Sequence, residues 1–137
     1  MRICIDTNVL VQMFGRQQPF RALREALTGG RVELAVSNDI LLEYEETITR
    51  LSGPARWQQV ERLLAAVFQV HANILFIDPR FRFAVVTTDP DDNKFVDCAI
   101  AAQADFIITA DTHFKPLATS GYKPKPITPE EFIQKYL

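Results

Sequence analysis

The chain has 137 residues, of which 47% are hydrophobic and 23% are charged. This composition is typical of a globular protein, argues against disorder, and predicts one domain over residues 1–137. The net charge is −2, so the chain lacks the strong positive charge that is typical of many nucleic-acid-binding proteins. This net charge does not exclude a nucleic-acid partner. Carboxylates that bind a cation count as negative in the net charge and so mask local positive charge.

Cysteine usage and hydropathy narrow the classes of protein further. Cys4 and Cys98 each lie in an apolar run and are expected to be small buried side chains, so neither a disulfide framework nor a zinc site is indicated. This usage is consistent with a reducing cytosol, and we expect a cytoplasmic protein. No run reaches the roughly 18 apolar residues of a membrane helix, and Asp6 interrupts the apolar N-terminal run. We therefore expect neither a membrane segment nor a signal peptide.

Hydrophobic periodicity and turn residues predict strands that alternate with helices. Strands are predicted at 2–5, 32–36 and 105–109, with short extended pieces at 73–79 and 83–90 and at most an edge strand in the proline-rich stretch 122–128. Helices are predicted at 8–14, 19–28 (with Pro19 as its first residue), 37–51, 55–72, 92–104 and 128–137, where Thr128 and Glu131 form a capping box. The alternation implies an α/β fold with a mainly parallel central sheet.

Acidic residues flank the predicted strands at the edge where parallel sheets form their sites. Asp6 directly follows the first strand, and Asp111 comes two residues after the strand at 105–109. Glu43 lies on the helix after the second strand, and Asp92 opens the helix that precedes the last buried strand. Converging carboxylates repel one another beside an apolar core, and the nearest basic partner is Lys94. The natural counter-ion is Mg²⁺ or Mn²⁺, as one or two ions, because these ions prefer oxygen ligands and activate water for attack on a phosphodiester.

The helix at 92–104 offers two candidates for the third acid. Asp92 and Asp97 are five residues apart, about 140° around a helix, and do not share a face, whereas Asn93 and Asp97 do. Either Asp92 or Asp97 is the main ligand, with the other peripheral, or a distorted start of the helix lets both reach the site.

Three stretches, "CIDTNVLV", "LLEY" and "DPDDNKFVDCAIAAQADFIITAD", together resemble the PIN-domain family, in the branch of VapC-like toxin components of toxin–antitoxin pairs. The resemblance extends from residue 3 to about residue 132 and implies a PIN-like three-layer α/β/α fold. The family's four acids fall on Asp6, Glu43, Asp92 and Asp111. The family spacing between the last two acids favours Asp92, and Asp97 is kept as a supplementary metal ligand.

The resemblance implies a Mg²⁺- or Mn²⁺-dependent endoribonuclease that hydrolyses RNA and pairs with an antitoxin protein encoded alongside it. It also implies a homodimer, and it assigns both catalysis and metal binding to the four acids. The family pattern also includes small polar residues near the acids, and these correspond to Asn8 and Thr109 in this sequence. They are expected to orient carboxylates or waters.

Two other functions are compatible with the sequence. A catalytically idle PIN-like domain would bind RNA or a protein partner without cleaving it. A phosphoacceptor signalling domain also places carboxylates and Mg²⁺ at the carboxyl ends of parallel strands. It requires an acidic pair at the first strand and a Lys directly after the last, and here Lys115 lies six residues after Thr109.

Basic residues near the acids are candidates for phosphate contacts. They are Arg16, Arg21, Arg24, Arg80, Arg82, Lys94, His113 and Lys115. His71 and His113 show no spacing typical of metal ligands, so neither is predicted to bind metal.

Overall fold

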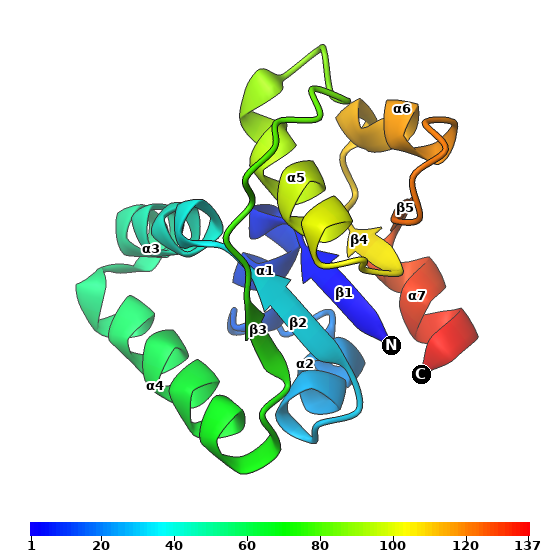
Figure 1. Cartoon of the computed structure of the whole chain (residues 1–137). Coiled ribbons are helices and arrows are strands. Elements are labelled where there is room, and N and C mark those ends of the chain that lie inside the picture. The colour runs from blue at the N-terminus through cyan, green and yellow to red at the C-terminus, as the bar shows by residue number, and fades with distance from the viewer.

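A computed structural model describes residues 1–137, and a five-stranded parallel sheet forms its centre (Figure 1). The strands are β1 (Arg2–Ile5), β2 (Glu33–Val36), β3 (Ile74–Phe76), β4 (Phe106–Ile108) and β5 (Lys125–Ile127), in the order β3-β2-β1-β4-β5 across the sheet. All neighbouring pairs are parallel. The carboxyl ends of the strands therefore meet at one edge, which we call the carboxyl edge.

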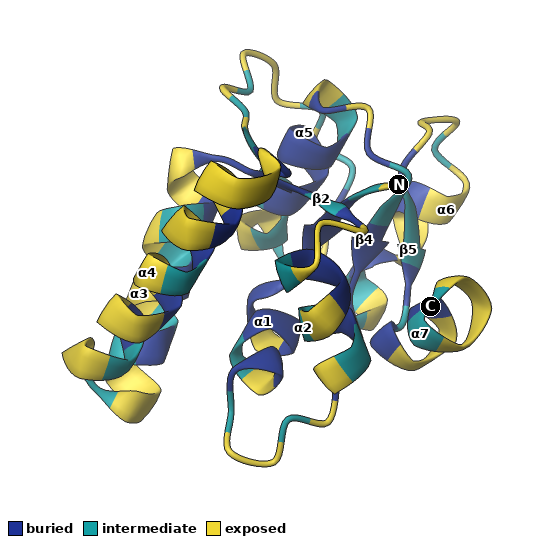
Figure 2. Ribbon diagram, turned by 90° about the horizontal axis from the view of Figure 1, so that it is seen from below, coloured by how far each residue is buried: buried dark blue, intermediate teal, exposed yellow.

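Seven α-helices surround the sheet: α1 (Thr7–Met13), α2 (Arg21–Thr28), α3 (Asn38–Ser52), α4 (Pro54–His71), α5 (Asn93–Ala101), α6 (Lys115–Ala118) and α7 (Pro129–Tyr136). Figure 2 shows α5 on one side of the sheet and α1, α2 and α7 on the other, with α3 and α4 to one side. Two short 3₁₀ helices, η1 (Pro90–Asp92) and η2 (Thr112–Phe114), precede α5 and α6. The layers confirm the predicted α/β/α fold. No helix of the chain combines the length and the apolar composition that a membrane crossing needs.

Burial explains the composition of the central strands. Residues 3–5 of β1, 34–36 of β2 and 107–108 of β4 are fully buried, because helices cover both faces of the sheet. Strands in this position have continuous apolar runs rather than an alternating pattern. Tyr44 of α3 is also fully buried, and its hydroxyl donates a hydrogen bond to the carbonyl oxygen of Ile5. This bond fixes α3 against the end of β1.

Capping residues set the ends of several helices. The Ser37 hydroxyl accepts a hydrogen bond from Ile40 N (3.3 Å) at the start of α3, and the Thr128 hydroxyl accepts one from Glu131 N (3.2 Å) at the start of α7. Gly53, with a left-handed φ of 89°, ends α3, and Pro54 begins α4. These ends lie within one or two residues of the predicted ones.

Two predicted helices are shorter in the structure. The helix predicted from Pro19 begins at Arg21, because Gln18 has a φ of 45° and its carbonyl oxygen accepts from Arg21 N in a preceding turn. The helix predicted at 92–104 is preceded by η1, which contains Asp92, and it ends before Gln103, whose φ is 54°.

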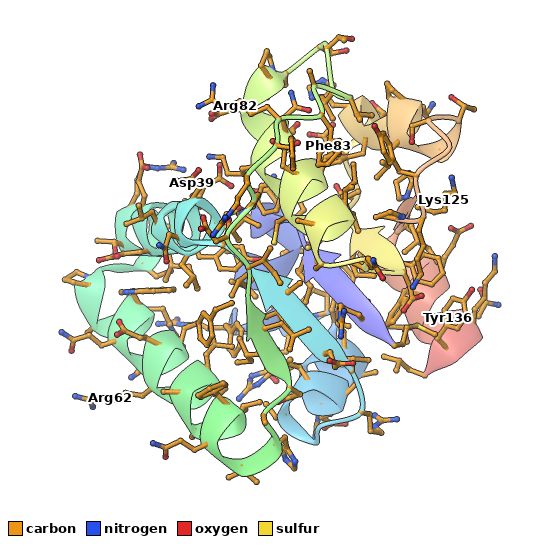
Figure 3. All side chains as sticks on the ribbon, viewed as in Figure 1. Asp39, Arg62, Arg82, Phe83, Lys125 and Tyr136 are labelled. Carbon is orange, nitrogen blue, oxygen red and sulfur yellow. The ribbon has the colours of Figure 1, made fainter.

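The piece predicted to be extended at 83–90 belongs to an irregular segment, residues 77–89, which we call the tethered segment. Two side chains of α5 hold it. Phe83 N donates to Asp97 Oδ1 (3.0 Å), and Asn93 makes two hydrogen bonds with the backbone of Val86 (2.9 and 2.8 Å). Because Asn93 occupies both polar backbone groups of Val86, this residue cannot pair with a strand. Arg82 and Phe83, labelled in Figure 3, lie on this segment beside α5.

Candidate active site

Asp6 lies at the carboxyl edge, between β1 and α1, and is only 7% exposed. Its Oδ1 accepts a hydrogen bond from Thr7 N (2.8 Å), and its Oδ2 accepts one from the Thr109 hydroxyl (2.8 Å). Burial raises the pKa of Asp6, and the charges of Asp111 and Glu43 add to this effect, while the two hydrogen bonds lower it. The carboxylate is thus oriented by its neighbours and sensitive to the charge of two other predicted acids.

Thr109 links the acids that follow β1 and β4. Its hydroxyl donates to Asp6 and accepts a hydrogen bond from Asp111 N (3.0 Å). Asp111 Oδ1 in turn accepts from His113 N (2.8 Å) and caps η2. Thr109 therefore has the contacts expected of a residue that orients carboxylates.

Glu43 reaches the site from α3. Its Oε2 accepts a hydrogen bond from the Thr7 hydroxyl, and its Oε1 lies 2.9 Å from Lys94 Nζ. Lys94 is also 3.8 Å from Asp91, whose side chain is 81% exposed. Lys94 thus balances only part of the negative charge.

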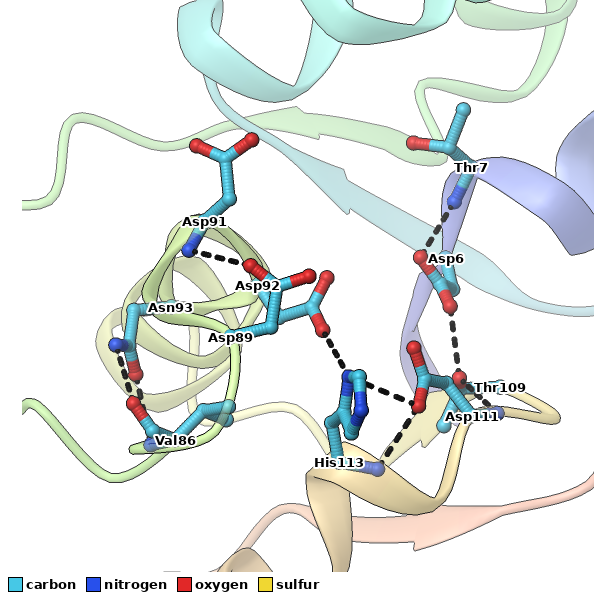
Figure 4. A network of polar contacts seen from close by, with 10 residues as sticks. All are labelled: Asp6, Thr7, Val86, Asp89, Asp91, Asp92, Asn93, Thr109, Asp111 and His113. Carbon is cyan, nitrogen blue, oxygen red and sulfur yellow. Dashed lines mark hydrogen bonds and ion pairs between the residues drawn. The ribbon is translucent and has the colours of Figure 1, made fainter.

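Asp92 lies at the end of η1, with its side chain 15% exposed. Its pKa is raised to about 6, first by burial and then by the charges of Asp6, Asp89 and Asp111, while contact with His113 lowers it. Figure 4 shows Asp92 and Asp111 on either side of His113, with Asp6 beyond Asp111. The structure therefore brings the four predicted acids together at one end of the sheet.

Two polar side chains, those of His113 and Thr7, make contacts that the sequence did not predict. His113 Nδ1 lies 3.3 Å from Asp111 Oδ1 and 3.5 Å from Asp92 Oδ2, although the residue was predicted only as a phosphate contact. Thr7 contacts Glu43, whereas its neighbour Asn8 is exposed and makes no side-chain hydrogen bond. Both lie within two residues of an acid that follows a strand, but Asn8 shares that position, so the spacing alone does not identify them.

Asp97 has a different environment from the other acids. Its Oδ1 accepts a hydrogen bond from Phe83 N, and its pKa is raised by burial and lowered by this bond and by the charge of Arg82. No other carboxylate contributes to the shift. The structure thus gives Asp97 a role in holding the tethered segment and does not bring it into the cluster of four.

The cluster has the features of a cation site. Lys94 is the only lysine or arginine within ion-pair distance of any of the four acids. Two buried atoms, Asp92 Oδ2 and His113 Nδ1, have no hydrogen-bond partner. A divalent ion among these groups would offset the excess charge and give the unpartnered atoms a partner, so the residues fit Mg²⁺ or Mn²⁺.

A cleft of about 470 Å³ opens beside Glu43. Its walls come from α3, from Asp91 of η1 and from Lys94 of α5. Solvent, and a substrate, can therefore approach Glu43 and Lys94 from outside.

Comparison with known structures identifies proteins of the same fold. A chain in the crystal structure of VapBC2 from Rickettsia felis, bound to a DNA fragment from their promoter, is 16% identical, with a TM-score of 0.59. The match covers 92% of this chain and 98% of that one. A chain in the structure of FitAB bound to an IR36 DNA fragment is 19% identical, with a TM-score of 0.58, and the match covers 93% of this chain and 94% of that one. At these identities the likeness shows the fold alone.

The sequence was also compared with curated proteins and with models of protein families. No curated protein matches it. A family model described as PIN domain matches residues 2–113, a stretch that contains all four acids of the cluster. The chain therefore belongs to the PIN-domain family.

Proposed function

We propose that the protein is a Mg²⁺- or Mn²⁺-dependent endoribonuclease that hydrolyses RNA phosphodiester bonds. The observation that carries this proposal is the convergence of Asp6, Glu43, Asp92 and Asp111 at the carboxyl edge, with Lys94 as the one lysine beside them. Membership of the PIN-domain family supports it, because the resemblance of the motifs to that family implies this reaction.

Each polar group near the cluster has a proposed task. Oxygen atoms of the four acids hold one or two ions, and Thr109 keeps Asp6 and Asp111 in place through its two hydrogen bonds. A bound divalent ion supplies charge stabilisation at the phosphate and lowers the pKa of water. Lys94 Nζ lines the cleft and can exchange its contact with Glu43 for one with a phosphate oxygen.

Cleavage of end-labelled single-stranded RNA tests the proposal. We expect wild-type protein to cleave in Mn²⁺ or Mg²⁺ and not in EDTA, and Asp92→Asn to lose activity by about tenfold to a hundredfold or more. Asp78→Asn is the matched control, because it makes the same change at an acid that is 89% exposed and lies outside the cluster and the cleft. It should keep its activity.

Two results would contradict the nuclease proposal in different ways. Cleavage that persists in EDTA, or in Asp92→Asn at the wild-type rate, would remove the metal site from the reaction. A folded wild type that binds Mn²⁺ but cleaves none of several RNAs would favour the alternative, a catalytically idle PIN-like domain that binds RNA or protein.

We also propose that the protein is the toxin component of a toxin–antitoxin pair, with an antitoxin protein as its partner, and that it forms a homodimer. The resemblance of the motifs to VapC-like proteins supports this, as does the fold shared with chains of VapBC2 and FitAB. A groove of about 390 Å³ offers a site for a partner segment away from the acids. Its lining is mixed: five hydrophobic residues, Val11, Phe14, Ile48, Leu51 and Val60, lie beside Gly15, Ser52 and the basic side chains of Arg16 and Arg56.

A further inference from the structure

The imidazole of His113 points into the acid cluster. Its Nδ1 lies 3.3 Å from Asp111 Oδ1 and 3.5 Å from Asp92 Oδ2. Dashed lines in Figure 4 mark both contacts. The nitrogen is buried and makes no hydrogen bond. Both distances exceed the range of about 2.7–3.2 Å for an N–H···O hydrogen bond.

In the tautomer with its proton on Nε2, the Nδ1 lone pair faces two carboxylate oxygens, and a cation between these three atoms would offset their mutual repulsion. Asp89 adds a third carboxylate on the same side. The ligand atoms of Asp89, Asp92 and His113 all lie within 4.8 Å of one another. Two ligand atoms that lie on opposite sides of one ion, each about 2.1 Å from it, are roughly 4 Å apart. The separations of these three ligand atoms are only slightly larger.

We propose that His113 Nδ1 is a metal ligand which, with Asp89 and Asp92, makes a mixed nitrogen and oxygen site selective for first-row transition ions such as Mn²⁺ over Mg²⁺. The inference deepens the proposed metal-dependent function and rests on it. Imidazole binds first-row transition ions, least tightly Mn²⁺ and more tightly the later ions, whereas Mg²⁺ takes oxygen ligands and keeps its waters. A nitrogen donor at this position therefore favours the transition ion.

His113→Gln is a suitable variant because it leaves the local turn intact. The hydrogen bond from residue 113 to Asp111 Oδ1 comes from the backbone and does not depend on the imidazole. His71→Gln is the matched control, because His71 is the only other histidine and is exposed at the end of α4. Circular dichroism and an unfolding curve of each metal-free variant check the fold, with His113→Asn as a second variant.

Pulsed electron paramagnetic resonance of Mn²⁺-loaded protein, without RNA, reads the ligand directly. We expect modulation from a directly bound ¹⁴N nucleus in the wild type and in His71→Gln, and its loss in His113→Gln and His113→Asn. In competition titrations, His113→Gln should bind Mn²⁺ about tenfold more weakly, while its Mg²⁺ affinity changes by less than about twofold.

Three outcomes would overturn the inference: no Mn²⁺ binding by the folded wild type, bound Mn²⁺ without nitrogen modulation, or an equal loss of Mg²⁺ and Mn²⁺ affinity in His113→Gln. Because none of these measurements uses RNA, they separate this inference from the nuclease proposal. A protein with the nitrogen signal and no RNA cleavage would count against the nuclease alone.

Discussion

The carboxyl group of Asp92 has a strongly raised pKa. Its pKa is about 6 in the folded protein, compared with 3.8 in an unfolded chain. Below pH 3.8 the group is protonated in both states. Between these two values the folded state keeps a proton that the unfolded state releases, so a rise in pH lowers the free energy of unfolding. Above pH 6 the group is ionised in both states, and the free energy of unfolding decreases no further on account of Asp92.

We therefore expect the metal-free Asp92→Asn variant to gain stability relative to the wild type as the pH rises from 4 to 7. One pKa unit corresponds to about 1.4 kcal/mol, and water near this carboxylate screens its charge, so the gain should be about 1–2 kcal/mol. Urea unfolding of both proteins at several pH values measures it. If the difference in unfolding free energy between the variant and the wild type stayed constant from pH 4 to 7, the pKa of Asp92 would not be raised in the folded protein.

At the scale of single elements, α5 contributes to the structure in two ways. It begins directly after Asp92 and so positions that acid, and its Asn93 and Asp97 side chains hold the backbone of the tethered segment. Asp97 is buried but contacts a backbone amide rather than another acid. We therefore expect mutation of Asp97 to loosen the tethered segment, whereas mutation of Asp92 changes the acid cluster.

Asp97→Ala should release the segment around Phe83 and lower the free energy of unfolding by about 1–3 kcal/mol, because it leaves a partly buried N–H without a partner. Limited proteolysis should then cut within residues 77–89 faster than in the wild type. Asp97→Asn retains an acceptor oxygen and should keep both the slow proteolysis and the thermal stabilisation by Mn²⁺. Loss of that stabilisation in Asp97→Asn would instead make Asp97 a metal ligand.

Sequence reasoning predicted the elements whose signals are local. The apolar runs of β1 and β4, each followed by an acid, identified the sheet and the positions of Asp6 and Asp111, since parallel strands bring their carboxyl ends together. The tethered segment could not be predicted in the same way. Its residues favour an extended conformation, but the side chains of Asp97 and Asn93 take up backbone groups of Phe83 and Val86 that a strand would pair.

The position of His113 depends on tertiary structure to a still greater degree. Its contact with Asp92 forms because η1 and η2, which are separated by α5 and β4, bring their ends together. No spacing along the chain encodes that contact. The same limit applies to Thr7 and Asn8, since two adjacent polar residues at the start of a helix differ only in which one faces Glu43.

At the scale of the whole molecule, an ion bound by residues from four separate elements should stabilise the entire fold. At a Mn²⁺ concentration one hundred times the Kd, the expected gain is about 2.7 kcal/mol, and the melting temperature rises with it. Asp6→Asn should weaken this effect, while Asn still serves as a cap for α1. Thermal unfolding with and without Mn²⁺ measures it, with Asp78→Asn as control. A wild-type melting temperature that does not change with Mn²⁺ would count heavily against the site.

The proposed homodimer also has a candidate surface. β3 is an edge strand, and Phe76 on it is 61% exposed beside Phe68 of α4, with ring centroids 5.4 Å apart. An exposed apolar edge of this kind is a typical contact site between chains. We expect Phe76→Ser to shift the wild-type dimer toward monomer in sedimentation experiments. Phe81→Ser, which changes a 74% exposed phenylalanine elsewhere, should not, and a monomeric wild type would refute the proposed dimer.

The order of the strands also affects how the protein is made. β1 and β4 are neighbours in the sheet, yet Asp6 and Thr109, which join at their ends, are 103 positions apart in the chain. A nascent chain on the ribosome therefore holds Asp6 and Glu43 long before it can add Asp92 and Asp111. Closing so long a loop is a slow step in folding. The proposed nuclease site is therefore incomplete until Asp92 and Asp111 have been added and β4 has joined β1 in the sheet.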